Sequence, residues 1–131
     1  MEAHLLPLEH RAKADDEVAA RDAYLTLLGV AEGERVLEVG CGSGAVTRAI
    51  AARVGTRGRA VGLDQSPALL SIAAELAATA GLSERVEFRV GDARRLPFED
   101  GQFDAALTVT VLSHVPQGED AIPELVRVVR P

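Results

Sequence analysis

The sequence predicts an α/β fold in which helices cover both faces of a parallel sheet. Short apolar segments of strand type alternate with helical segments of about 10 to 15 residues, an order typical of parallel strands joined by right-handed crossovers. In addition, residues 36–44 read V-L-E-V-G-C-G-S-G: an apolar run, an acid, then glycine at every second position. This pattern indicates a buried strand that ends in a loop where the backbone approaches a ligand closely.

The helices are predicted from apolar periodicity and from their end signals. In the first, Val18, Leu25 and Leu28 share one face, and a glycine follows as a stop. In the third, Ser66 is an N-cap and Pro67 takes the first helical position, which is a strong start. The predicted helices are 12–28, 45–54, 66–80 and a last one that begins near Asp120.

Four strands are predicted between these helices. Residues 35–39 and 59–64 are apolar, and the second of these segments ends in an acid. Residues 85–90 alternate polar and apolar side chains, so this strand has one wet face or lies at a sheet edge. Residues 105–112 are almost continuously apolar, as expected of a strand that is covered on both faces.

Composition bounds the class of protein. The chain has 131 residues, and we expect one domain with an N-terminal helical segment at 1–31 and an α/β core at 32–131. The net charge of −6 argues against a nucleic-acid partner. No apolar run approaches the roughly 20 residues that span a bilayer, and no signal peptide is evident. The single cysteine excludes a disulfide and a cysteine-rich zinc site, so we expect a cytoplasmic protein without a metal.

The glycine loop is compatible with two cofactors. Residues 40–45 match the dinucleotide pattern G-x-G-x-x-G/A, and Asp64 lies about 20 residues further on, where an acid would hold a ribose hydroxyl. Glu38, however, ends the first strand just before the first glycine, where a carboxylate would face the ligand and repel a pyrophosphate. The same charge would attract the sulfonium and ammonium groups of S-adenosylmethionine.

The motifs that follow resemble those of the class I S-adenosylmethionine-dependent methyltransferases. They are V-G-L-D-Q-S-P at 61–67, G-D-A-R-R-L-P-F at 91–98, F-D at 103–104 and V-L-S-H-V at 111–115. The chain is most similar to the small-molecule branch typified by the ubiquinone and menaquinone biosynthesis methyltransferases, from about residue 35 to residue 131. The resemblance implies a Rossmann-like fold with strand order 3-2-1-4, S-adenosylmethionine as cofactor and S-adenosylhomocysteine as product.

The resemblance also implies the residues of the cofactor site. Asp64 would accept both ribose hydroxyls, with Gln65 beside the adenine. Asp92 would accept the adenine amino group, with Ala93 contributing a backbone N–H. Glu38 would fix the loop or the cofactor's amino group, and the end of the fourth strand would lie near the sulfur. The implied cofactor contacts are Glu38, Gly40, Cys41, Gly42, Gly44, Asp64, Gln65, Asp92, Ala93, Thr108 and Val109.

Each of these assignments has a structural alternative. Asp64 would otherwise cap the following turn, although Ser66 already supplies a cap. Asp92 follows a glycine and would otherwise be an ordinary turn acid. Glu38 would brace the loop by accepting backbone N–H groups. Cys41 is interpreted as a small buried filler.

Outside the cofactor set, His114 is the candidate catalytic residue. It follows the fourth strand on the catalytic side and would act as a general base, or it packs near the rim. Asp104 opens the fourth strand, at the end far from the ligand, and is expected to be structural. Arg94 and Arg95 are expected on a solvated helix face.

The family pattern normally continues past R-V-V-R-P at 127–131 into a glycine turn and further strands. The sequence therefore covers the cofactor half and little of the acceptor half, and it leaves the fourth strand at a sheet edge that favours a homodimer. We expect in-line methyl transfer to a small-molecule O, N, C or S acceptor. The alternatives are an NAD-dependent oxidoreductase and a non-catalytic cofactor-binding or assembly module.

Overall fold

The computed structural model describes residues 7–108 and 121–131. Helices and strands follow each other in the predicted order, and they alternate except where the fourth strand comes directly after the third. The elements are α1 (Pro7–Leu28), β1 (Arg35–Val39), α2 (Ala45–Val54), β2 (Arg59–Asp64), α3 (Pro67–Thr79), β3 (Val86–Val90), β4 (Ala105–Thr108) and α5 (Ala121–Val128).

The four strands form one parallel sheet in the order β3-β2-β1-β4. In this register Glu38 of β1 lies between Gly62 of β2 and Leu107 of β4. Because all the strands run in the same direction, their carboxyl ends meet at one edge of the sheet. The predicted fold class and the strand order 3-2-1-4 are confirmed.

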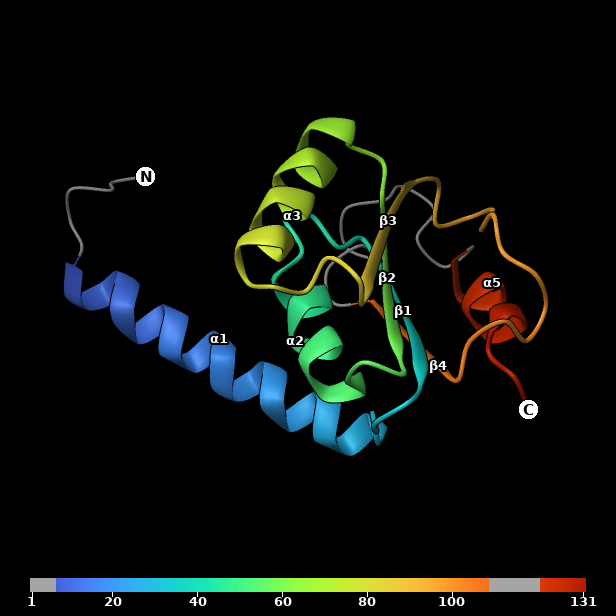
Figure 1. The fold of residues 1–131 in the computed structure, drawn as a ribbon, viewed down its shortest axis with the longest axis horizontal. Coiled ribbons are helices and arrows are strands. Elements are labelled where there is room, and N and C mark those ends of the chain that lie inside the picture. Colours follow the sequence, from blue (N-terminus) through green and yellow to red (C-terminus); the bar gives the residue numbers. More distant parts are fainter. Residues whose placement is uncertain (1–6, 109–120) are drawn as a thin grey trace.

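Helices cover both faces of this sheet. Figure 1 shows α2 and α3 on one face and α5 on the other, while α1 runs past α2 and projects beyond the sheet. Leu25 of α1 is fully buried and packs with α2. Burying a leucine in this way contributes roughly 1.5–3 kcal/mol, which anchors the carboxyl end of α1. The core on the α5 face comprises Leu37, Val39, Val61, Leu63, Ala93, Leu96, Phe98, Phe103, Ala121 and Val128.

The helix boundaries follow local end signals. The hydroxyl of Ser66 accepts the N–H of Leu69 at 3.2 Å, and Pro67 takes the first position of α3, as predicted. The first helix begins at Pro7, earlier than the predicted residue 12. Proline is tolerated in the first turn of a helix, so Pro7 is compatible with this earlier start.

The outer strands differ in how well their sequences indicated their positions. β3 grades from half-buried to exposed, in agreement with the alternation that predicted an edge strand. Residues 105–108 of β4 are half-buried, so the expectation of cover on both faces is wrong for them. Within the described part of the chain β4 pairs with β1 alone, and residues 109–112 of the predicted strand lie outside it.

Over 7–108 and 121–131, no helix is both long enough and apolar enough to cross a membrane.

Candidate functional site

The loop after β1 has left-handed backbone at alternate residues. The φ angle is 78° at Gly40, 55° at Gly42 and 84° at Gly44, a region that other residues rarely adopt. A Cβ at Gly42 would meet no atom within 4 Å, whereas one at Gly44 would lie 3.1 Å from the Cβ of Ala73. The loop therefore leaves its backbone open at Gly42 and packs closely on α3 at Gly44.

Asp64, the last residue of β2, joins three segments at this edge of the sheet. Its Oδ2 accepts the N–H of Gly42 at 2.9 Å, and its Oδ1 accepts the N–H of Ser66 at 3.0 Å. Its carbonyl oxygen accepts the N–H of Gly91, just after β3, at 3.1 Å. We expected Ser66 to cap the following turn without Asp64. This expectation is wrong, because the side chains of both residues accept hydrogen bonds there. Each carboxylate oxygen carries two lone pairs, so Asp64 retains capacity for neutral donors.

Glu38 lies beneath the glycine loop and is 3% exposed. The hydroxyl of Thr47 donates to its Oε1 at 2.6 Å. Thr47 lies in the first turn of α2, whose N-cap, Gly44, has no side chain that could accept a hydrogen bond. A carboxylate at this place also interacts favourably with the helix dipole. Through this contact Glu38 braces the first turn of α2, which begins directly after the glycine loop.

Burial changes the protonation of two groups near the loop. Desolvation raises the pKa of Glu38 to about 7, although hydrogen bonds from Thr47 act in the opposite direction. Burial likewise raises the pKa of the Cys41 thiol to about 12, so the thiol stays neutral and a poor nucleophile. A Cβ at Gly62 would lie 2.8 Å from the Cys41 sulfur, so Cys41 fills the space above that glycine.

Asp92 follows β3 and is engaged by a neighbouring arginine. Its Oδ1 accepts the backbone N–H of Arg94 at 2.8 Å, and its Oδ2 accepts an Arg94 guanidinium N–H at 2.9 Å. The hydrogen bonds from Arg94 lower the pKa of Asp92. Arg94 and Arg95 lie in a turn, so the predicted helix face at these residues is wrong. The glycine and the following acid start a tight turn here instead of a helix.

The remaining predicted residues lie at different places. Gln65 is exposed beside Asp64, and Ala93 is buried at 3% exposure. Thr108 ends β4, and its hydroxyl is buried without a hydrogen-bond partner among the described residues. Val109 and His114 lie outside the described residues.

Asp104 lies at the opposite end of the sheet, as predicted. Its Oδ2 accepts the backbone N–H of Arg35 at 2.8 Å, and it forms an ion pair with Arg130. It therefore links the start of β1 to the segment after α5. No group of three or more histidine, cysteine, aspartate or glutamate residues in the described ranges could hold a metal ion.

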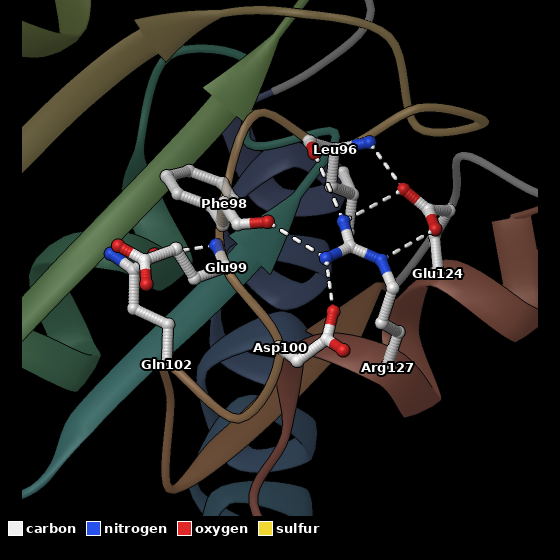
Figure 2. Close-up of polar contacts among 7 residues, drawn as sticks. All are labelled: Leu96, Phe98, Glu99, Asp100, Gln102, Glu124 and Arg127. Atoms are coloured by element: carbon white, nitrogen blue, oxygen red, sulfur yellow. Dashed lines mark hydrogen bonds and ion pairs between the residues drawn. The ribbon is translucent and has the colours of Figure 1, made fainter.

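Three residues that sequence reasoning missed support this edge of the sheet. Thr47 contacts Glu38, while Glu124 and Arg127 of α5 hold the segment that leads from Asp92 toward β4 (Figure 2). Each of them is separated along the chain by at least nine residues from the segment that it contacts. A local motif contains no information about such pairs.

A parallel sheet with a glycine loop after its first strand and acids after the next two defines a Rossmann-like cofactor-binding domain. The sequence matches the family described as "Methyltransferase domain" over residues 36–131. The chain belongs to this family.

Two curated relatives are also named as methyltransferases. The chain is 39% identical to the 2-phytyl-1,4-naphtoquinone methyltransferase of Synechococcus elongatus, across 76% of this chain and 42% of that protein. It is 36% identical to a ubiquinone/menaquinone biosynthesis C-methyltransferase of Pseudomonas savastanoi, across 82% of this chain and 42% of that protein. The chain thus spans less than half the length of these relatives.

Solved structures share the fold. The [4+2]-cyclase SpnF superposes with a TM-score of 0.79 at 33% identity, covering 86% of this chain and 41% of that one. An S-adenosylmethionine-dependent methyltransferase of Aquifex aeolicus superposes with a TM-score of 0.77 at 25% identity, covering 85% and 58%. A methyltransferase and a protein named as a cyclase therefore share this architecture, so function must be argued from the site.

The raised pKa of Glu38 predicts a pH-dependent stability. Between the ordinary value of 4.5 and about 7, the folded chain keeps a proton that the unfolded chain has lost. The stabilising contribution is complete below pH 4.5 and is lost as the pH rises through 7. From about pH 5 to about pH 8, the unfolding free energy should fall by about 2–3 kcal/mol more in the wild type than in Glu38→Gln.

Urea unfolding at several pH values measures this difference. Glu75→Gln, which alters an exposed glutamate of α3, is the matched control and should follow the wild type at every pH. Parallel profiles for the wild type and Glu38→Gln would contradict the raised pKa.

Proposed function

We propose that this chain binds S-adenosylmethionine at the carboxyl ends of β1, β2 and β3, and that the protein transfers the methyl group to a small molecule. The observation that carries the proposal is the bond from the Gly42 N–H to Asp64, which fixes an open backbone loop beside an acid. Membership of the methyltransferase domain family supports it. That membership gives no support to the nicotinamide-dependent alternative.

The residues at this edge offer the cofactor open space and hydrogen-bond acceptors. The open space at Gly42 leaves room for a ligand against the loop that includes Gly40, Cys41 and Gly44. Ribose hydroxyls and an adenine amino group are neutral donors, and carboxylates such as Asp64 and Asp92 accept from them.

The other proposed contacts come from the residues beside the two acids and from the segment at the end of β4. Gln65 and Ala93 would lie beside the adenine, and the buried hydroxyl of Thr108 is a further group for the ligand. Val109 would lie near the sulfur, and His114 is the proposed general base; both lie outside the described residues.

In the proposed mechanism the chain positions the reactants and shields them from water. When bound, the cofactor supplies a methyl group that is already activated by a positively charged sulfur. The glycine loop and the two acids hold the reactants in line, which replaces a bimolecular encounter by an oriented one. Glu38 is ionised above about pH 7, and its charge then attracts cationic groups above the loop. No nucleophile of the chain is needed.

Calorimetry with S-adenosylhomocysteine and with NAD tests the proposal. We expect micromolar binding of the homocysteine compound and none of NAD. NAD binding without binding of S-adenosylhomocysteine would contradict the proposed function. Methyl transfer to a panel of phenols, quinols, amines and thiols then distinguishes an enzyme from a non-catalytic binding module.

Asp64→Asn tests the ribose contact. It keeps the size of the side chain and removes its charge, so affinity for S-adenosylhomocysteine should fall by about 1–3 kcal/mol, roughly 5- to 150-fold. Asp22→Asn alters an aspartate of α1 whose side chain is 65% exposed, and it should leave the affinity unchanged. An unchanged affinity in folded Asp64→Asn would remove Asp64 from the site.

The acceptor side of the proposal rests on a pocket of about 500 Å³ between α1 and β4. Three leucines line it together with Tyr24 and Thr108, and one of these leucines, Leu27, is 88% exposed. Burial and the nearby Glu38 raise the pKa of Tyr24, so its hydroxyl stays neutral. Relatives named for naphthoquinone and ubiquinone/menaquinone methylation support an apolar acceptor here.

Leu27→Glu tests this location with 1-naphthol as the probe. The variant places a charge at the rim, and we expect at least about tenfold weaker 1-naphthol binding with unchanged affinity for S-adenosylhomocysteine. Leu76→Glu, on the exposed side of α3, is the control and should bind the probe normally. Equal losses in the two variants would show that the probe binds elsewhere.

We further propose a homodimer through the β4 edge. In the described chain β4 has one neighbouring strand, and beside it Ala106, Leu125, Val126 and Val129 line an apolar groove. Light scattering should detect a dimer that Val126→Glu dissociates, since Val126 is 70% exposed on α5. Leu69→Glu on α3 should leave it intact, and a folded wild-type monomer at high concentration would contradict the dimer.

We also propose that residues 1–131 form one domain and that the protein is cytoplasmic. Cys41 is buried as a free thiol, which suits a reducing compartment. Fractionation of the source cells tests the location, and recovery in an extracellular fraction would contradict it.

A further inference from the structure

Arg127 of α5 makes five hydrogen bonds with its guanidinium group, and three of them hold the neighbouring segment at residues 96–100 (Figure 2). Its Nε donates to Glu124 at 2.8 Å, and one terminal nitrogen donates to Asp100 at 2.9 Å and to the Phe98 carbonyl at 2.8 Å. The other terminal nitrogen donates to the Leu96 carbonyl and to Glu124, each at 3.0 Å. Arginine carries five N–H donors in a fixed plane, and this arrangement employs all of them.

Side chains of α5 bind both the N–H and the carbonyl group of Leu96. Glu124 Oε1 accepts the Leu96 N–H at 2.7 Å, and Arg127 donates to the Leu96 carbonyl. Leu96 itself is 4% exposed and packs in the core with Ala121 and Val128 of the same helix. Leu96 is therefore fixed by side-chain packing and by its backbone at once.

Leu96 directly follows the turn that carries Asp92. The N–H of Arg95 donates to the Asp92 carbonyl at 3.0 Å and closes the turn, and the two residues form an isolated bridge. Ala93, inside the turn, is buried against the same core as Leu96. Fixing Leu96 therefore fixes the position from which the Asp92 carboxylate projects.

The inner side of this turn is held more firmly than its outer side. Outside, Asp92 and Arg94 pair with side chains that are 40% and 39% exposed, and ion pairs so accessible to water contribute little. Inside, the Glu124 side chain is 20% exposed and its bonds reach a buried backbone. Charge-assisted bonds in such surroundings are the stronger kind.

From these contacts we infer that Glu124 and Arg127 are positioning residues that set the selectivity of the site for the adenine base of the cofactor. They act through Leu96 and the turn at 92–95, without touching the ligand. The inference rests on the proposed function, because it takes Asp92 as the acceptor of the adenine amino group.

A pair of ligands that differ only at that amino group tests the inference. S-adenosylhomocysteine has the amino group, and its 6-deamino analogue has a hydrogen atom bonded to carbon there, which does not donate to Asp92. Calorimetry on the wild type should give at least about tenfold tighter binding of the adenosyl compound. In Arg127→Lys, which keeps the charge but has three donors in place of five, this ratio should fall below about threefold.

Two further variants separate positioning from general stability. Glu124→Gln should reduce the ratio in the same way, and it keeps the test open if Arg127→Lys fails to fold. Arg53→Lys, at an arginine of α2 that bonds to Asp22 and Thr26 of α1, is the matched control and should keep the wild-type ratio.

The possible outcomes distinguish a failure of this inference from a failure of the proposed function. Equal weakening of both ligands in Arg127→Lys and Glu124→Gln, with the ratio unchanged, would overturn the inference and show a merely structural role. A wild type that binds both ligands equally would also overturn it. A wild type that binds neither would overturn the proposed function as well.

Discussion

The carboxylate of Asp64 is the constraint on which the functional edge of this sheet depends. It ties the glycine loop after β1 to the end of β2 and to the start of α3, and the carbonyl of the same residue ties in the segment after β3. Glu38 adds a further link at this edge, because it accepts a hydrogen bond from the hydroxyl of Thr47 in α2. Three strand ends thus share one hydrogen-bonded frame, which keeps an unusual left-handed loop in a single conformation.

Three acids lie at this edge, and their surroundings give them different properties. Glu38 is buried, and desolvation raises its pKa to about 7. Asp64 is half-buried and uses both oxygens within the frame. Asp92 is more exposed, and hydrogen bonds from Arg94 lower its pKa. A ligand with a cationic centre and several neutral donors matches this set better than a pyrophosphate does.

Local signals in the sequence predicted most of the fold and located the glycine loop of the candidate site. Ser66 and Pro67 marked the start of α3, and glycines at alternate positions marked the loop, because caps and backbone angles depend on single residues. Thr47, Glu124 and Arg127 were missed, since their partners lie in other elements. The role of Asp64 in the following turn was underestimated although its partner, Ser66, lies only two residues away, because Ser66 was expected to cap that turn by itself. Arg94 was placed on a helix where the structure has a tight turn.

The central claim is that a cofactor binds against the glycine loop at the carboxyl edge of the sheet. Titration of the isotopically labelled chain with S-adenosylhomocysteine, followed by backbone amide shifts, tests it most directly. The account predicts the largest changes at residues 40–44, 64–66 and 91–93, with none at 99–104 on the opposite edge. Changes concentrated at 99–104, or no change at the glycine loop under saturating ligand, would contradict it.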